Sequence, residues 1–256
     1  MKPLLGNLTN MVKVSRSIVP SFFTVGNMFC GFYSVISALN GNFVLSAWMI
    51  FAGAFLDLMD GKVARFTRSS SKFGVEYDSL ADVISFGFAP SFLIYMVFGQ
   101  SMGVIGIFIS FLPLLFGSIR LARFNVKLDG FNKDFFSGLP IPIAALTLSS
   151  FVIFSDYFFA IPAKFPKTMI ILILFVSILM VSNVRYEVAP NLNFKGPWRD
   201  KIKVFLAMAG GILLIIFPQE VLFPLMILYI LSGLVGVLVR LGAAPAQLKK
   251  EQDNLS

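Results

Sequence analysis

The chain has 256 residues, of which 57% are hydrophobic and only 13% charged, and it contains 30 phenylalanines. Soluble domains carry about a quarter charged residues, so this composition excludes an ordinary soluble fold and indicates a polytopic helical membrane protein. The formal net charge is +8, but the basic residues alternate with apolar segments and form no continuous patch. We therefore expect no binding of nucleic acid, and basic cytoplasmic loops explain the charge better.

Apolar segments of nearly the length needed to cross a bilayer, roughly 20 residues, recur along the whole chain. Eight can be delimited, at residues 18–39, 43–58, 79–98, 103–122, 141–162, 168–183, 203–217 and 221–239. The sequence thus predicts an all-α polytopic membrane protein with about eight transmembrane helices, broken by turns such as Asn40-Gly41-Asn42. In the polar, basic segment 1–17 we expect no cleavable signal peptide, and from about Ala243 we expect a polar, loosely ordered tail.

The positive charges indicate the orientation of these spans. If the N-terminus lies in the cytoplasm and the spans alternate, Lys164 and Lys167 face outward while the other basic residues of the loops lie inside. An even number of spans, with both termini in the cytoplasm, satisfies the positive-inside rule. One span more or fewer would move several basic residues to the wrong side.

Missing residue types limit the possible chemistry. The chain contains no histidine, and Cys30 is its single cysteine. This excludes an intramolecular disulfide and a zinc site built from several cysteines or histidines. It also excludes a synthase of the phospholipase-D type, which needs catalytic histidines. Acid–base or metal chemistry must therefore be carried by carboxylates.

Four aspartates lie near the cytoplasmic ends of two consecutive spans, Asp57 and Asp60 on the second, Asp78 and Asp82 on the third. Ionisable residues at membrane depth cost roughly 2.5–3.5 kcal/mol each on insertion, so they indicate function. Spacings of three and four residues put each pair on one helix face, and the short connection between the spans aims both pairs at one cavity. Four close carboxylates need cations. Magnesium or manganese, bound as a pair that clamps a phosphate, would suit these ligands.

The residues beside the aspartates fit a phosphate-bearing ligand. Gly61 and Gly74 leave room for a bulky group close to the helix backbone, and Ala64 keeps the same face small. Arg65 is placed to meet a phosphate. Together with the aspartates, these residues predict a site for phosphoryl transfer.

In chain order these residues form the pattern Asp57-x-x-Asp60-Gly61-x-x-Ala64-Arg65, eight further residues, and Gly74-x-x-x-Asp78-x-x-x-Asp82. The pattern resembles, at every fixed position, the signature of the CDP-alcohol phosphotransferase family. The resemblance covers roughly residues 15–190. It implies a six-helix catalytic core at 18–190, two additional helices at 191–240 and a cytoplasmic tail at 241–256.

The resemblance also implies a mechanism. In a CDP-linked lipid, the hydroxyl of a small alcohol would attack the phosphorus atom bonded to the lipid part, and CMP would leave. Two divalent ions, magnesium or manganese, would be held by Asp57, Asp60 and Asp78, with Asp82 as a shared ligand or as the general base. The CDP site would be lined by Gly61, Ala64, Arg65 and Gly74.

Other stretches resemble the phosphatidylserine synthase branch of that family. They are Pro20-Ser21-x-x-Thr24-x-x-Asn27, Arg120-Leu121-Ala122-Arg123-Phe124-Asn125, Ser137-Gly138-Leu139-Pro140-Ile141-Pro142 and Val181-Ser182-Asn183-Val184-Arg185-Tyr186. This likeness implies CDP-diacylglycerol as the donor and L-serine as the acceptor, with Thr24 and Asn27 at the donor lipid.

A zwitterionic acceptor needs a cation for its carboxylate, and an arginine can supply two parallel hydrogen bonds. The candidates lie at the ends of spans and are Arg120, Arg123, Asn125 and Arg185. Other interpretations stay open, because arginines also anchor spans by reaching the interface and Asn125 can bond a helix end. Pro140 and Pro142 fit an ordinary helix start equally well.

Two alternative functions were weighed. A sister enzyme using glycerol 3-phosphate or inositol phosphate would need more cationic residues around the cavity. A carboxylate-lined ion transporter would place its charges near the midplane and show inverted repeats, whereas here the charges lie toward one membrane face and no repeat is visible. The resemblance implies instead an enzyme of the inner, cytoplasmic membrane, with its site on the cytoplasmic side, and a homodimer.

Overall fold

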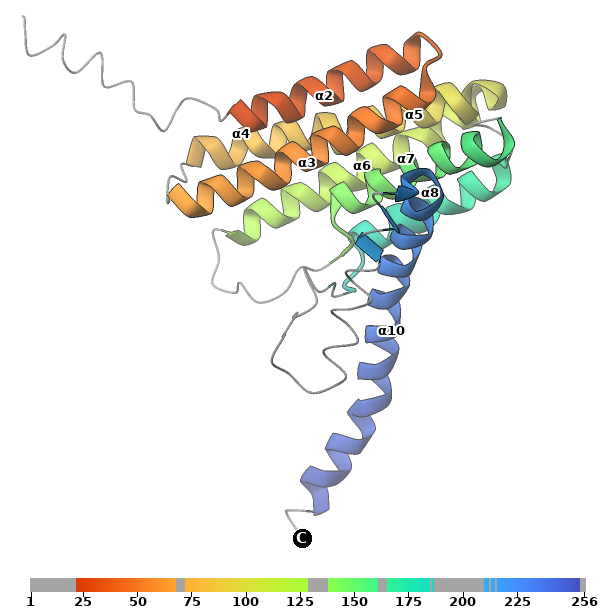
Figure 1. The fold of residues 1–256 in the computed structure, drawn as a ribbon. Helices are drawn as coiled ribbons and strands as arrows, with labels where there is room; N and C mark the ends of the chain where they lie inside the picture. The colour runs from red at the N-terminus through yellow and green to blue at the C-terminus, as the bar shows by residue number, and fades with distance from the viewer. Residues whose placement is uncertain are drawn as a thin grey trace, which may run out of the picture.

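The computed structural model describes residues 22–67, 72–128, 138–160, 165–184, 186, 210–211, 213–214 and 216–253. Within these ranges the backbone is helical apart from short turns, and it contains no strand. Figure 1 shows most helices as parallel rods in one bundle, with the last helix leaving it at an angle. The predicted segment 1–17 and most of the predicted span 203–217 lie outside the described residues.

The first hairpin consists of α2 (Phe22–Leu39) and α3 (Phe43–Thr67), which pack against each other along their length. The predicted turn between them is confirmed, and Gly41 adopts φ +78° there, a conformation that glycine reaches without steric cost. In the interface, the buried hydroxyl of Ser34 donates to the carbonyl oxygen of Ser46 at 2.9 Å. Small, internally satisfied residues of this kind let membrane helices approach closely.

The third crossing is one helical rod with two π-helical turns. It comprises α4 (Lys72–Asp82), the π-helix η1 (Val83–Phe88), α5 (Ala89–Ile94), the π-helix η2 (Tyr95–Gly99) and the short 3-10 turn η3 (Gln100–Met102). The buried hydroxyl of Ser85 in η1 donates to the carbonyl oxygen of Asn27 at 2.8 Å. Gly31 of α2 faces Ser85 so closely that a Cβ there would come within 2.8 Å of the Ser85 Cα. The segment directly after Asp82 therefore docks on α2.

The chain reverses at Gly103, which has φ +59°, and returns as α6 (Gly103–Leu128), packed against η1, α5 and η2. Pro113 lies inside α6, where a proline removes one backbone hydrogen bond. The next backbone N–H, that of Leu114, donates to the hydroxyl of Ser91 at 3.1 Å. The irregular turn of α6 is thus joined to α5 by a side-chain hydrogen bond.

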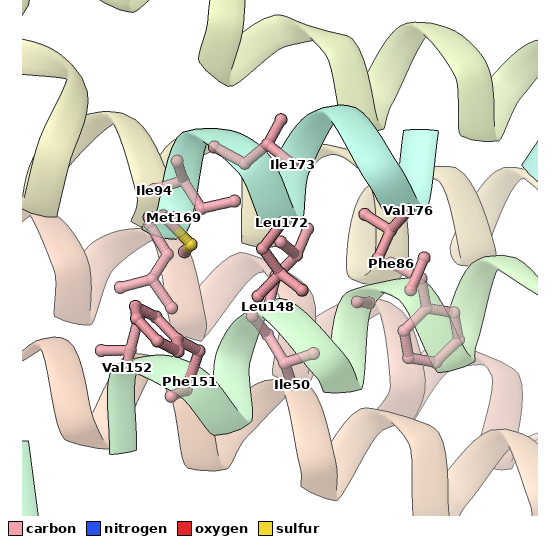
Figure 2. Close-up of a cluster of buried hydrophobic side chains, with 14 of the residues drawn as sticks. Ile50, Phe86, Ile94, Leu148, Phe151, Val152, Met169, Leu172, Ile173 and Val176 are labelled. Carbon is pink, nitrogen blue, oxygen red and sulfur yellow. The ribbon is translucent and has the colours of Figure 1, made fainter. Parts of the chain in front are cut away.

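The most buried crossing helix is α7 (Ile141–Phe159). Figure 2 shows its residues Leu148 and Phe151 in an apolar cluster with Ile50 of α3 and with Leu172 of α8 (Pro166–Val181). The predicted proline-shaped start is confirmed, because a proline stands in the first turn of α7. This cluster forms the core on which the hairpin of α2 and α3 rests.

The last described helix, α10 (Pro218–Asp253), packs against α7. At its start the hydroxyl of Tyr157 donates to Oε1 of Glu220 at 2.9 Å. Figure 1 shows the C-terminal part of α10 extending away from the bundle. The helix α10 continues to Asp253, past the start of the predicted polar tail at about Ala243, through residues such as Gln247 and Lys249 that favour helix.

The all-α polytopic architecture is confirmed. Five described stretches are long and apolar enough to cross a bilayer, and Pro166–Val181 is a shorter apolar helix; the five are Phe22–Leu39, Phe43–Val63, Phe73–Val126, Ile141–Phe159 and Pro218–Val237. Phe73–Val126 folds back at Gly103, so described helices coincide with each of the predicted spans except 203–217. The helices carrying the aspartates are longer than their apolar runs, α3 reaching Thr67 and α4 beginning at Lys72.

The backbone at the end of α8 packs closely against the backbone just before α7, and we call this contact the α7–α8 junction. Gly138 adopts φ +88°, and its N–H donates to the carbonyl oxygen of Val184 at 2.9 Å. A Cβ at this position would collide with the carbonyl oxygen of Met180. Because the obstacle is backbone rather than a flexible side chain, it cannot easily move aside.

We therefore expect Gly138→Ala to lower the thermal unfolding temperature of the detergent-solubilised protein markedly. A left-handed conformation costs an alanine about 1–2 kcal/mol, and the collision with Met180 adds to that. Gly41→Ala is the matched control, because Gly41 also has positive φ but no atom lies within 4 Å of an added Cβ. Equal losses in the two variants would show that the contact with Met180 does not constrain the junction.

Candidate functional site

Three aspartates from two neighbouring helices meet at one point. Asp57 of α3 and Asp78 and Asp82 of α4 each contribute a carboxylate oxygen, and these oxygens lie within 4.8 Å of one another. All three residues are half-buried. The two helices meet because α3 ends, and α4 begins, on either side of a connection of a few residues, and both pack on α2.

This group of three carboxylates suits a divalent cation. Close carboxylates repel one another when ionised, and within a membrane protein this repulsion is poorly screened by water. Among the described residues, the buried Oδ1 of Asp78 has no hydrogen-bond partner. A donor set made only of oxygens fits a hard ion such as magnesium or manganese, so these residues can hold one.

Asp60 is placed differently from the other three aspartates. It lies one turn after Asp57 on α3, but its carboxylate does not belong to the group of three. Its Oδ2 instead accepts a hydrogen bond from the hydroxyl of Thr24 on α2. The structure therefore brings three of the four predicted ligands together and ties the fourth to α2.

Asn27, one turn after Thr24 on the same helix, contacts the group directly. Its Nδ2 donates to Oδ1 of Asp82 at 3.3 Å, and the residue is fully buried. The close approach of α3 depends on Gly53, since a Cβ there would lie 3.0 Å from the Asn27 side-chain oxygen. Thr24 and Asn27, which the sequence associates with the donor lipid, thus both touch aspartates and fix their orientation.

The small residues of the predicted CDP site lie along the same two helices. Gly61 is exposed, and no atom lies within 4 Å of a Cβ built on it. Gly74 is half-buried in the first turn of α4. Ala64 and Arg65 belong to α3, but their side chains lie outside the described part of the structure.

Arg120 of α6 is the one predicted serine-binding arginine in the described residues that is buried, with 7% of its surface exposed. It interacts electrostatically with Asp82 and with Tyr229 of α10. Its Nε has no hydrogen-bond partner within the described residues. The buried guanidinium of Arg120 therefore lies near the aspartate group, and its Nε–H is an unused hydrogen-bond donor.

The other candidates for serine binding have different surroundings. Arg123 is exposed, and its Nη1 donates to the carbonyl oxygen of Val181 at the end of α8, at 3.0 Å. Asn125 donates to the hydroxyl of Ser79 at 3.0 Å, which links α6 to the residue after Asp78. Arg185 lies outside the described residues.

Two polar residues near the site were missed from the sequence. Ser79 carries no signal beyond its position next to Asp78. Tyr229 is a single polar aromatic residue within the apolar run 221–231. Tyrosine in membrane helices is usual at the interfaces, so an isolated one inside a span is a weak signal that could have pointed to it.

Comparison with known proteins agrees with this geometry. The family model described as CDP-alcohol phosphatidyltransferase matches residues 17–161, a range that contains all four aspartates and the helices from α2 to α7. That family depends in general on divalent metal ions, and the aspartate group described above could hold one. The helices α8 and α10 lie beyond the matched range.

Individual relatives extend over more of the chain. The CDP-diacylglycerol–serine O-phosphatidyltransferase of Helicobacter pylori (strain ATCC 700392 / 26695) is 38% identical over 218 residues, covering 85% of this chain and 90% of the relative. The archaetidylserine synthase of Methanothermobacter thermautotrophicus is 36% identical over 182 residues, covering 70% of this chain and 74% of the relative. The serine O-phosphatidyltransferase of Bacillus subtilis is 38% identical over 130 residues, covering 51% and 72%. On the family match and these identities, the chain belongs to the CDP-alcohol phosphatidyltransferase family.

Proposed function

We propose that this protein transfers the phosphatidyl group of CDP-diacylglycerol to the hydroxyl of L-serine and releases CMP. One observation carries the proposal: Asp57, Asp78 and Asp82 converge in a chain that is 38% identical, over most of its length, to relatives named as serine O-phosphatidyltransferases. Carboxylates that share a divalent ion are suited to phosphoryl transfer, in which the negative charge of the phosphates must be offset.

In the proposed reaction the serine hydroxyl oxygen forms a bond to the phosphorus that carries diacylglycerol. The bond from that phosphorus to the oxygen bridging to CMP breaks, and CMP leaves with the bonding electrons. The hydroxyl proton passes to a carboxylate, for which we propose Asp82. Its orientation by Asn27 supports this role, because a general base must be held in position to accept a proton.

The remaining carboxylates are proposed metal ligands. Asp57 and Asp78 would hold the ion together with Asp82, and Asp60 is the fourth candidate ligand, one turn along α3. Magnesium or manganese, as one or two ions, would offset the charge of the donor pyrophosphate when bound. The unpartnered Oδ1 of Asp78 supports a ligand role for that residue.

For the donor nucleotide we propose the side of α3 and α4 that carries Gly61, Ala64, Arg65 and Gly74. The open space beside Gly61 supports this assignment, since a nucleotide can approach a glycine backbone closely. For the acceptor carboxylate we favour Arg120, because it is buried and retains an unused donor. Arg123 and Asn125 already bond within the fold, and Arg185 stays a candidate from the sequence.

The chain is an integral membrane protein, and we propose that its site faces the cytoplasm of an inner membrane. The distribution of basic loop residues supports this sidedness, and it would place the site beside water-soluble serine and CMP. We also propose that the protein forms a homodimer, on the basis of the family resemblance.

The proposal predicts that purified protein releases CMP from CDP-diacylglycerol only when L-serine and magnesium or manganese are both present. Release of labelled CMP should be compared with serine, glycerol 3-phosphate and inositol phosphate as acceptors, each with and without metal. Metal-dependent CMP release with a phosphorylated acceptor in place of serine would contradict the choice of acceptor. It would still support metal-dependent transfer at the aspartate group. No release with any acceptor, from protein shown to be folded, would contradict the proposed function.

Asp78→Asn is expected to reduce turnover by at least about 10³-fold, comparable to the largest losses on removing one preorganised electrostatic group. The protein should remain folded, because the substitution keeps the shape of the side chain and removes repulsion between carboxylates. Asp156→Asn is the matched control, since Asp156 lies on α7 beside residues 41–45, at the N-terminal end of α3 and away from the aspartate group. Turnover of Asp78→Asn close to that of Asp156→Asn would rule out the metal site.

A further inference from the structure

Arg120, Tyr186 and Tyr229 form a polar cluster that contains two buried donors without partners: Tyr186 stacks on Tyr229, and Tyr229 interacts electrostatically with Arg120. Tyr186, just after the end of α8, has 5% of its surface exposed, and Arg120 has 7%. Neither the Tyr186 hydroxyl nor the Arg120 Nε has a hydrogen-bond partner among the described residues. A buried polar group without a partner destabilises the folded protein by roughly 1–3 kcal/mol. Two such groups in one cluster therefore suggest a function.

The Tyr186 ring is held firmly in place. It stacks on Tyr229 of α10, with ring centroids 5.7 Å apart and ring planes inclined by 21°. On α10 it also packs on Gly233, where a Cβ would collide with the ring and would lie 2.5 Å from Tyr186 Cδ1. A phenylalanine would satisfy these ring contacts equally well. The hydroxyl is therefore not needed for packing.

The cluster connects to the reacting group through charge. Arg120 interacts electrostatically both with Asp82 and with Tyr229, and Tyr229 stacks on Tyr186. Tyr186 and Tyr229 both lie beyond the range that the family model matches. Arg120 lies within that range, so the two tyrosines are the part of the cluster that is not covered by the family model.

We propose that Arg120, Tyr186 and Tyr229 form the pocket that binds the carboxylate of an amino-acid acceptor. The inference rests on the proposed function and adds the residues that select the acceptor. Arg120 and Tyr186 supply hydrogen bonds to the carboxylate, and Tyr229 is a positioning residue that keeps the Tyr186 ring in place.

The chemistry of the acceptor matches this cluster. In serine, only three carbon atoms link the hydroxyl to the carboxylate oxygens. Because Arg120 and Asp82 interact electrostatically, we infer that a carboxylate bound at Arg120 would bring the hydroxyl toward Asp82. Burial raises the pKa of Tyr186 to about 12, so its hydroxyl stays protonated and acts as a donor at physiological pH. Hydrogen bonds from such donors to a charged acceptor are stronger than those between neutral groups.

The test is Tyr186→Phe, which removes the hydroxyl and keeps the ring contacts. We expect the KM for L-serine to rise about 10-fold or more, as for loss of a hydrogen bond to a charged group, with the KM for CDP-diacylglycerol unchanged. The activity with L-serinamide, which lacks the carboxylate, should not change, so the preference for serine over serinamide should fall by the same factor. Tyr157→Phe is the matched control, because it removes a hydroxyl that bonds α10 far from the pocket.

The outcomes separate the two proposals. An unchanged serine KM in Tyr186→Phe, equal losses with serine and serinamide, or a raised KM for CDP-diacylglycerol would each overturn the carboxylate pocket while the wild type still used serine. Wild-type protein without serine-dependent CMP release would overturn the proposed function itself. Binding without turnover gives a second measurement: L-serine should raise the unfolding temperature of the wild type and of Tyr157→Phe, but not that of Tyr186→Phe.

Discussion

The structure depends on bringing like charges together at membrane depth. Asp57, Asp78 and Asp82 place oxygens within 4.8 Å of one another, an arrangement whose repulsion a bound cation would offset. Such a group costs stability in the absence of a ligand, and a purely structural helix bundle would avoid it. The free energy gained by helix packing must therefore offset the repulsion between the three carboxylates.

That packing energy comes from close contact between helices at small residues. Gly31 and Gly53 allow α2 to lie directly against η1 and α3, and Asn27 on the same helix donates to Asp82. The α2 helix thus both joins the two aspartate-bearing helices and orients their carboxylates. Groups that orient metal ligands in this way are commonly as important to a site as the ligands themselves.

The sequence predicted the fold class, the turn at Gly41 and the meeting of the aspartate-bearing helices, because hydropathy and helical spacing are local properties. It could not predict that the Asp60 carboxylate would lie outside the group, because Asp60 accepts a hydrogen bond from Thr24, a residue 36 positions away on α2. The bond from Arg123 to Val181 joins residues far apart in sequence. Helix ends were also underestimated, because α3 and α10 continue after their apolar runs stop.

The central claim, that three aspartates form one metal site, is tested most directly by manganese binding to the detergent-solubilised protein, followed by the electron paramagnetic resonance signal of free Mn²⁺. The wild type should bind Mn²⁺, and Asp57→Asn, Asp78→Asn and Asp82→Asn should each weaken binding about tenfold or more, while Asp156→Asn should not. Loss of about 10- to 100-fold is usual even for residues that only orient ligands, so the ligands themselves should lose at least as much. Wild-type protein that binds no Mn²⁺, or equal affinity in all four variants, would contradict the account.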